Sequence, residues 1–109
     1  MKNNFGFILV KPQLGENIGA CARSLKNFGF SKLFVVSPKY HFPNSQAKAT
    51  SVGAYDIIKN TKVYNDIEQA IHKFNIIVSL SARKRDINKK HISMNNLEKL
   101  IKSNKGKKI

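Results

Sequence analysis

The chain has 109 residues, of which 41% are hydrophobic, so it fits one small domain and is not compositionally disordered. Its single cysteine, Cys21, excludes an intrachain disulfide, and no run approaches the roughly 20 apolar residues of a membrane-spanning helix. The formal net charge of +14 at pH 7 indicates a polyanionic partner, most commonly nucleic acid, and we expect a cytoplasmic protein that does not bind membranes.

The positive charge is concentrated near the end of the chain. Residues 83–109 hold ten Lys or Arg and two acids, a net charge of +8 and more than half of the total. We interpret residues 1–109 as one domain whose last segment, 83–109, is a basic tail. A genome rich in A and T would also raise the lysine content, so charge alone leaves the partner open.

The first third of the chain has the pattern of a strand, a helix and a second strand. Residues 5–10 form a continuous apolar run, which predicts a strand buried on both faces. Asn17 is a preferred N-cap and Gly29 a preferred C-cap for the helix between them. Residues 32–37 predict the second strand, and such a unit is normally parallel and right-handed. The residues expected to face the core share helical spacing: Ile18, Cys21, Ala22, Leu25 and Phe28.

The middle of the chain continues the alternation with weaker patterns. Residues 43–52 predict a helix whose apolar face holds Ala47, Ala49 and Val52. Of two short apolar pieces, at 57–58 and 63–64, we expect one to be a brief strand.

The last third adds one helix, one strand and a basic end. Asn65 or Asp66 can cap a helix that reaches about residue 74, with Ile67, Ala70, Ile71 and Phe74 inward. Residues 75–81 predict a strongly buried strand, residues 95–103 a weak helix, and residues 106–109 the approach to another strand. The whole pattern predicts an α/β fold with a parallel sheet flanked by helices.

Three places could carry chemistry. Residues 15–20 lie where a dinucleotide-binding domain has its glycine-rich turn, but they lack that pattern, and a packing role is expected for Gly19. A helix N-terminus can hold an anion, so Asn17 could be a cap, a ligand contact or both. Arg23 lies off the stripe of core residues, so it is either a solvated surface arginine or a residue that contacts a ligand. Residues 79–83 lie at the C-terminal end of a predicted strand, where ligands gather in open α/β sheets. From the pattern alone, a simple turn that leads into the basic tail explains these residues equally well.

Other catalytic classes find no support in the residue pattern. The three histidines and the single cysteine lack metal-ligand spacing, so no metal site is expected. No arrangement of a nucleophile with a base, and no phosphate-binding loop, stands out. The residues by themselves therefore indicate a basic α/β domain with an anion or nucleic-acid ligand.

One long segment resembles a known family. The segment Pro12 to Gly29 contains Asn17-Ile18-Gly19, Ala22-Arg23 and Asn27-Phe28-Gly29, and it resembles the first motif of the SpoU family. This family comprises S-adenosylmethionine-dependent RNA ribose 2′-O-methyltransferases of the SPOUT superfamily. Residues 33–38 and 49–56 also look like the family, and Ser-Ala-Arg-Lys-Arg at 81–85 looks like a loop of the branch that methylates a ribose in the tRNA anticodon loop.

The resemblance implies a SPOUT-like parallel sheet with helices on both sides and a C-terminal trefoil knot. It further implies a homodimer whose knots bind S-adenosylmethionine. By match to the motif, Asn17 and Arg23 would be catalytic residues that face the RNA ribose and phosphate. Residues at the edge of the cofactor pocket would be Ser81, Ala82 and Arg83. Basic residues that contact RNA, most simply tRNA, would be Arg23, Lys26, Lys84, Arg85, Lys89 and Lys90.

The sequence departs from the family at its end. Family members continue with a glycine-containing strand and a segment with Pro and Ser-Leu-Asn, which form the knot and most of the cofactor pocket, whereas this sequence stops at Ile109. We therefore expect the chain to be inactive in methyl transfer on its own, with a homodimer partner or a complementing downstream chain as candidate partners. The alternatives are a non-catalytic basic RNA-binding module and the remnant of a split gene.

Overall fold

The computed structural model describes residues 4–42, 44–80 and 92–109. Within these ranges, three parallel strands form one sheet in the order β1-β2-β3: β1 (Phe7–Val10), β2 (Leu33–Val36) and β3 (Lys62–Tyr64). Phe7 pairs with Leu33, and Phe34 pairs with Lys62. The predicted parallel α/β fold is confirmed.

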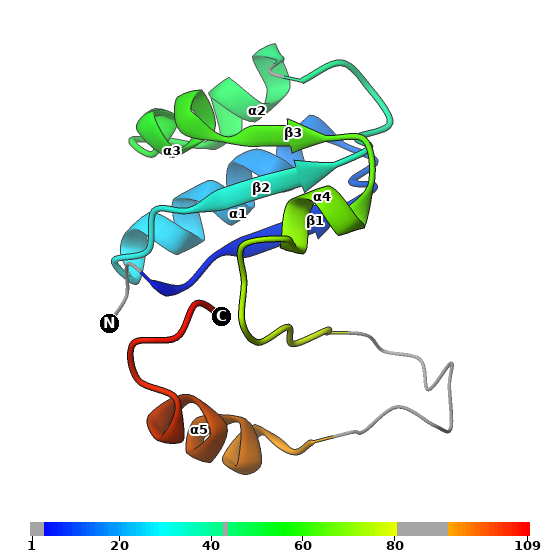
Figure 1. The fold of residues 1–109 in the computed structure, drawn as a ribbon. Helices are drawn as coiled ribbons and strands as arrows, with labels where there is room; N and C mark the ends of the chain where they lie inside the picture. The colour runs from blue at the N-terminus through cyan, green and yellow to red at the C-terminus, as the bar shows by residue number, and fades with distance from the viewer. Residues whose placement is uncertain (1–3, 43, 81–91) are drawn as a thin grey trace.

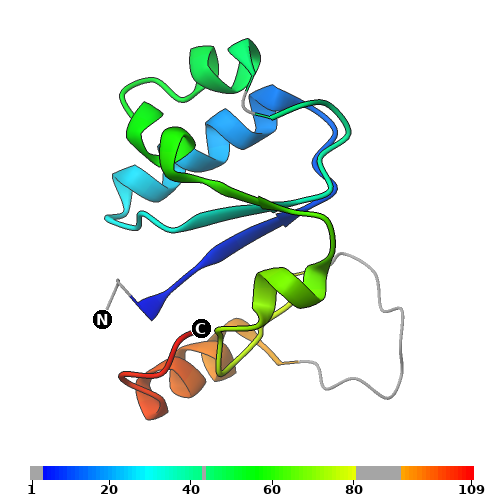
Figure 2. The same ribbon diagram turned by 45° about the horizontal axis from the view of Figure 1, so that its top comes forward.

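Helices cover the two faces of the sheet unequally. Helix α1 (Gly15–Asn27) connects β1 to β2, and helices α2 (Ser45–Thr50) and α3 (Tyr55–Asn60) lie between β2 and β3. Figure 1 and the turned view in Figure 2 show these three helices on one side of the sheet and the short α4 (Ile67–Ile71) on the other. Helix α5 (Met94–Ser103) confirms the weak helix expected near the end of the chain.

Helix α1 begins two residues before the predicted N-cap. Leu14 is the N-cap, with extended backbone at φ −120° and ψ 137°, and the Asn17 N–H already donates to the Leu14 carbonyl at 3.2 Å. Asn17 as the N-cap was therefore wrong, because its side chain lies inside the first turn. At the other end, Gly29 has a φ of 82°, and the N–H groups of Gly29 and Phe30 bond back to Lys26 and Leu25 carbonyls. The C-cap is Phe28, one residue before the predicted Gly29, and Gly29 takes the next position, where a left-handed backbone favours glycine.

The core lies between α1 and the sheet. Ile18, Ala22 and Leu25 are buried as the spacing predicted, and they pack with Leu33 and Val35 of β2. Two predicted members of the stripe differ. The side chain of Phe28 is 68% exposed, because the helix has already ended at that position. Cys21 is half-buried against the core, and this burial raises the pKa of its thiol.

The predicted apolar face of the second helix was wrong at two of its three positions. Asn44 caps α2 by accepting a hydrogen bond from the Ala47 N–H at 2.9 Å, and Ala47 is fully buried. Ala49 follows two residues later, about 200° around the helix, and is exposed. Val52 is also exposed, because α2 ends at Thr50 and Val52 enters the following turn with a φ of 31°.

The brief strand expected at one of the two short apolar pieces is β3, and residues 57–58 lie instead in α3. Helix α4 is shorter than predicted, and it is capped by Asp66, which accepts from the Gln69 N–H at 2.9 Å. Of the residues expected to face inward, Ala70 is buried whereas Ile67 is 42% exposed.

The strand predicted at residues 75–81 is absent from its described part, residues 75–80. Ile77 is 51% exposed and Leu80 is 85% exposed. The N–H groups of Asn75 and Ile76 both donate to the Lys108 carbonyl, at 2.8 and 3.1 Å, instead of extending along a strand. An apolar run becomes a buried strand only where it pairs along the edge of a sheet, and among the described residues 75–80 none is paired in the sheet of β1, β2 and β3.

The exposed edge of β1 is joined by the end of the chain. The Ile109 N–H donates to the Asn4 carbonyl at 2.9 Å, and the Gly6 N–H donates to the Ile109 carbonyl at 2.8 Å. This is the bonding pattern of a parallel bridge between Ile109 and Phe5. These two bonds agree with the expected approach of residues 106–109 to a strand, and Figure 1 shows the C-terminal segment beside the start of β1. The expectation that β1 is buried on both faces was wrong, since Val10 is 52% exposed at the thinly covered side.

Glycine at position 19 sets the distance between α1 and α2. A Cβ atom at Gly19 would overlap the Thr50 Oγ1 atom and would lie 2.5 Å from the Ala47 carbonyl oxygen. Gly15, one turn earlier, meets the Asn44 side chain in the same way. The two helices can approach this closely only because both positions lack a side chain.

We predict that Gly19→Ala destabilises the fold. Overpacking against the Ala47 backbone should cost about 1–3 kcal/mol, which outweighs the gain of up to about 1 kcal/mol in helix propensity. Urea denaturation followed by circular dichroism measures the free energy of unfolding. Ser24→Ala, at an exposed position of the same helix, is the control and should change it by less than about 0.5 kcal/mol. An unchanged or higher free energy of unfolding for Gly19→Ala would contradict the packing role.

Candidate functional site

A shallow groove of about 780 Å³ lies between α1 and α2. The α1 side supplies polar groups, and the α2 side supplies Ala49, Thr50 and Val52. The α1 residues that line the groove are Glu16, Asn17, Ala20, Arg23, Ser24 and Asn27. An α-helix turns about 100° per residue, so these residues lie within about one third of the circumference of α1. The two residues predicted to be catalytic, Asn17 and Arg23, therefore line the same groove.

The rotation of α1 fixes where these polar groups point. Its buried stripe, Ile18, Ala22 and Leu25, faces the sheet, so the groove residues are directed away from the core. Thr50 closes the contact between the helices, because its hydroxyl donates to the Gln46 carbonyl at 2.8 Å and lies 3.3 Å from the Glu16 carbonyl.

Asn17 and Arg23 are both exposed. Neither side chain has a hydrogen-bond or ion-pair partner among the described residues. Arg23 carries five N–H donors in a planar group that suits phosphate, and the Asn17 amide can both donate and accept. An anionic, hydroxyl-bearing ligand could therefore bond to these two side chains without first breaking a contact between described residues.

Lys26 points away from the groove toward α3. Its Nζ lies 2.9 Å from the Asp56 Oδ1 atom, and both side chains are about half exposed. The hydrogen bond from Lys26 is the main reason that the pKa of Asp56 is lowered below its ordinary value. Lys26 thus has an internal partner, and its role in RNA binding stays a prediction.

The remaining predicted site residues lie outside the described residues: Ser81, Ala82, Arg83, Lys84, Arg85, Lys89 and Lys90. Their predicted roles at the cofactor pocket and on RNA stay predictions. The predicted site residues did not include four polar residues of the groove: Glu16, Ser24, Asn27 and Thr50. Ser24 and Asn27 follow Asn17 at i+7 and i+10 and could have been found from that spacing. Thr50 could not, because its place depends on how α2 packs.

A parallel sheet with this helix arrangement belongs to the SPOUT class of methyltransferases. The crystal structure of TrmJ from Z. mobilis ZM4 matches with a TM-score of 0.86 and 31% identity, over 94% of this chain and 46% of that chain. The profile of the SpoU rRNA Methylase family matches residues 4–106, and the chain belongs to this family.

Sequence relatives agree with this assignment. A tRNA (cytidine/uridine-2′-O-)-methyltransferase TrmJ from Sodalis glossinidius is 40% identical over 87 residues, which are 80% of this chain and 34% of the relative. An uncharacterized tRNA/rRNA methyltransferase from Haemophilus influenzae is 31% identical over 98% of this chain and 44% of the relative. The chain thus spans between about a third and a half of the length of these relatives.

The family implies S-adenosylmethionine as the methyl donor, and the described residues do not form a site that suits it. The donor carries a positive sulfonium, and its ribose needs hydrogen-bond acceptors within an enclosed pocket. The groove is shallow, and the other described cavity is lined by four lysines and no acid, which would repel the sulfonium.

No helix among the described residues is long and apolar enough to cross a membrane.

We predict that Lys26→Gln raises the pKa of Asp56 toward the ordinary aspartate value of about 3.9. The pKa of this carboxyl is lower in the folded state than in the unfolded state, so the ionised carboxylate stabilises the fold at pH values above the unfolded-state pKa. This stabilisation is lost as the pH falls through the folded-state pKa. An NMR titration of the Asp56 carboxyl carbon measures the change. Lys105→Gln removes the same charge elsewhere and should leave the titration in place; an unmoved Asp56 titration in Lys26→Gln would rule out the pairing in solution.

Proposed function

We propose that this chain acts in the 2′-O-methylation of RNA, with tRNA as the substrate, and that the groove between α1 and α2 contacts the RNA. The observation that carries this proposal is the gathering of Asn17, Arg23, Ser24 and Asn27 along one groove, within a segment matched by the family. The names of relatives that methylate tRNA and the net charge of +14 support it. The cytoplasmic location expected from the sequence belongs to the same proposal.

The role proposed for the groove residues is to bind and orient the RNA. A ribose hydroxyl is a weak nucleophile, so its position relative to the donor determines much of the rate. A guanidinium group offers N–H donors and no acceptor, so Arg23 is suited to hold a phosphate and to stabilise negative charge, and not to act as a base. Asn17 lies on the same helix face and can bond to a ribose hydroxyl.

The methyl donor is placed elsewhere in this proposal. It is bound by residues outside the described ranges, among them Ser81, Ala82 and Arg83, or with the help of a second chain. That second chain is a homodimer partner or a complementing chain, and the 109-residue chain alone is expected not to transfer methyl groups. Because the chain spans less than half of its relatives, the activity of a whole enzyme is part of the proposal.

We predict that the chain binds unmodified tRNA with steep salt dependence. Each neutralised phosphate releases counterions, so contacts with three or more phosphates should weaken binding about tenfold or more between roughly 50 and 200 mM salt. Fluorescence anisotropy with a labelled transcript measures the dissociation constants. No binding at low salt, or an affinity that salt does not change, would reject RNA as the partner.

We predict that Arg23→Ala abolishes methyl transfer without loss of the fold. The assay measures radiolabelled methyl transfer to unmodified tRNA by this chain fused to the part of Z. mobilis TrmJ that lies beyond its match. Arg23→Ala should lower turnover at least tenfold, about 1.4 kcal/mol, because the alanine side chain cannot hold the phosphate. The free energy of unfolding should change by less than about 0.5 kcal/mol, since the residue is exposed.

Two comparisons make this experiment decisive. Lys105→Ala removes one charge far from the groove and should leave turnover unchanged. Wild-type turnover by Arg23→Ala would make Arg23 a solvated surface residue. Binding of tRNA together with no methyl transfer by the fusion would favour the alternative of a non-catalytic RNA-binding module.

A further inference from the structure

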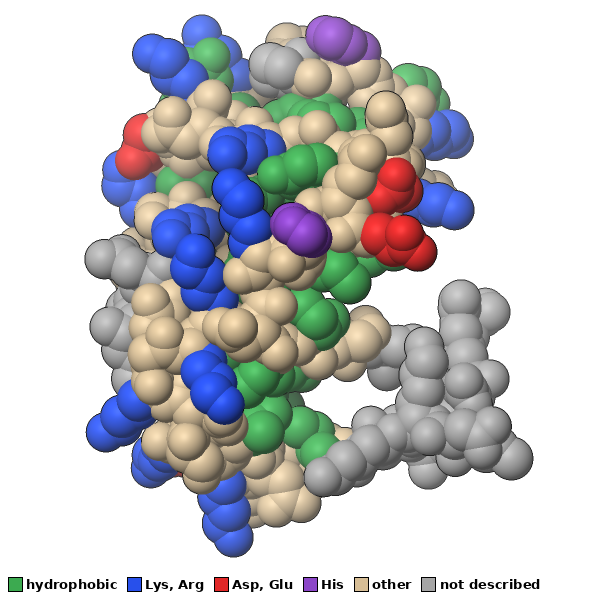
Figure 3. Space-filling view, in the orientation of Figure 1, with side chains coloured by type: hydrophobic (Ala, Val, Ile, Leu, Met, Phe, Trp, Pro, Cys, Tyr) green, Lys and Arg blue, Asp and Glu red, His purple; other side chains and the backbone are tan. Residues whose placement is uncertain are grey.

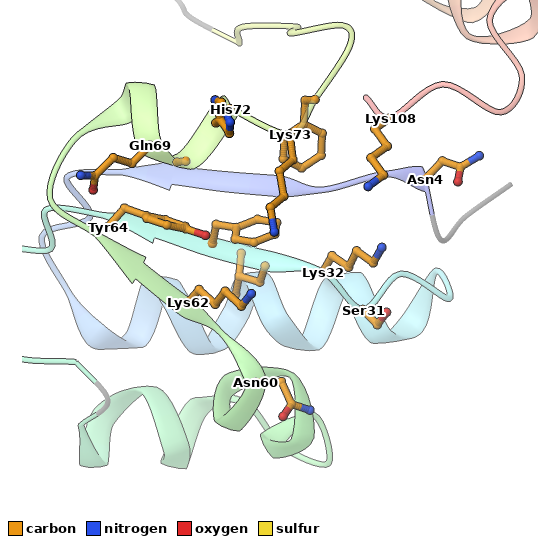
Figure 4. Close-up of a pocket in the computed structure, with 14 residues that line it drawn as sticks. Asn4, Ser31, Lys32, Asn60, Lys62, Tyr64, Gln69, His72, Lys73 and Lys108 are labelled. Atoms are coloured by element: carbon orange, nitrogen blue, oxygen red, sulfur yellow. The ribbon is translucent and has the colours of Figure 1, made fainter.

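A second cavity, of about 590 Å³, lies on the opposite face of the sheet from α1. It is formed near the amino ends of the strands, because Lys32 precedes β2 and Lys62 begins β3. Figure 4 shows side chains from both strands, from α4 and the residues after it, and from the end of the chain around one hollow. The cavity shares no lining residue with the groove that holds Asn17 and Arg23.

Aromatic rings form a row across this cavity. Since Leu33 and Val35 face α1, strand alternation directs Phe34 to the cavity side, and its register partner Lys62 and the next alternate residue, Tyr64, face the same way. The ring centroids of Phe34 and Tyr64 are 6.2 Å apart, and those of Phe34 and Phe74 are 5.9 Å apart with the rings nearly perpendicular. All three rings remain partly exposed.

Gly6 makes room for one end of the aromatic row. A Cβ atom at this position would lie 2.6 Å from the Phe74 Cε1 atom and 3.1 Å from a ring carbon of Phe34. The absence of a side chain on Gly6 therefore lets the Phe74 ring lie against the backbone just before β1. The row depends on residues from four parts of the chain: Gly6 before β1, strands β2 and β3, and the segment after α4.

Four lysines surround the row, and no acidic residue lines the cavity. They come from four separate segments: Lys32, Lys62, Lys73 and Lys108. The ion pairs between described residues involve Lys26 and Lys102, so none of these four ammonium groups is neutralised by a carboxylate there. Figure 3 shows Lys and Arg side chains running down this face beside hydrophobic surface, with the acidic side chains of the view toward its upper edges. Four positive charges around one cavity attract an anion, and a bound phosphate would reduce their mutual repulsion.

We propose that this cavity binds one nucleotide of a single-stranded RNA segment, with the base against the aromatic row and the phosphates at the lysines. The proposal rests on RNA as the partner of the chain and adds a contact site that the groove does not include. A bare inorganic anion would leave the rings unused, whereas a nucleotide uses both the rings and the lysines. Because a base paired in a duplex is already stacked, the segment has to be single-stranded. RNA held at both places would contact both faces of the sheet.

The test measures binding of fluorescein-labelled hexauridylate to the whole chain by fluorescence anisotropy. Lys62→Gln/Lys73→Gln should weaken binding about fivefold or more and reduce the salt slope by about 1–2, one unit for each phosphate that is no longer neutralised. Lys99→Gln/Lys105→Gln removes the same charge from exposed positions outside the cavity and should weaken binding less than about twofold. Tyr64→Leu should weaken binding about fivefold or more with an unchanged salt slope, because this change removes stacking and leaves the charge in place.

The outcomes separate this inference from the proposed function. If the two double variants weaken binding equally, the lysines act only through net charge and the cavity site is overturned. If wild-type chain binds hexauridylate and all cavity variants bind as tightly, the site is overturned while RNA binding stands. If wild-type chain binds neither hexauridylate nor tRNA, both proposals fail. Circular dichroism checks the fold of Tyr64→Leu, and the lysine variants, at exposed positions, test the site independently of that ring.

Discussion

Helix α1 is held by the sheet and by helices α2 and α3, and the direction of its candidate groove residues follows from that. On one side its stripe of Ile18, Ala22 and Leu25 packs on the sheet. On another side Gly19 lets the backbone of α2 approach within contact distance. With two sides fixed, the helix cannot rotate about its axis without opening a cavity or creating an overlap. The remaining side, which carries Arg23, is the one left for a ligand.

The two faces of the sheet offer different chemistry. The groove on the α1 side presents amide, hydroxyl, guanidinium and carboxylate groups together with the apolar side chains of Ala20, Ala49 and Val52. The cavity on the α4 side combines ammonium groups with aromatic rings. Hydrogen-bond donors in fixed directions suit phosphate and ribose, whereas rings and flexible charges suit an unpaired base and its backbone. A small basic domain can thereby divide one polyanionic ligand between two surfaces.

The sequence predicted those parts of the fold that depend on local pattern. The unit of β1, α1 and β2 followed from its apolar periodicity and from Gly29, which ends the helix. The predictions failed where the outcome depended on distant neighbours. Residues 75–80 have a strand-like composition, but the N–H groups of Asn75 and Ile76 bond to Lys108. The N-cap was misplaced because Asn17 has the right side chain, whereas the extended backbone that starts the helix is at Leu14.

For the two sites as well, features of the local sequence could be predicted, whereas features that depend on packing between distant segments could not. The resemblance to the family singled out Asn17 and Arg23, and the structure places both along the same groove. Thr50 enters the groove only through the packing of α2 on Gly19, which no single-sequence pattern shows. The aromatic row is further from prediction, since Phe34, Tyr64 and Phe74 come from three segments and meet through strand register.

The bridge between Ile109 and Phe5 joins residues at opposite ends of the chain. Bringing such distant positions together closes a loop that contains almost every residue, and the entropy lost on closure rises by about 0.6 kcal/mol with each doubling of loop length. Contacts of high sequence separation form late in folding, after the shorter connection between β1 and β2. The amide of Gly6 is bonded to Ile109, whereas the neighbouring amide of Phe7 is bonded to Lys32. Two adjacent amides at the start of β1 therefore depend on two different segments of the chain, and hydrogen exchange can measure the opening of each separately.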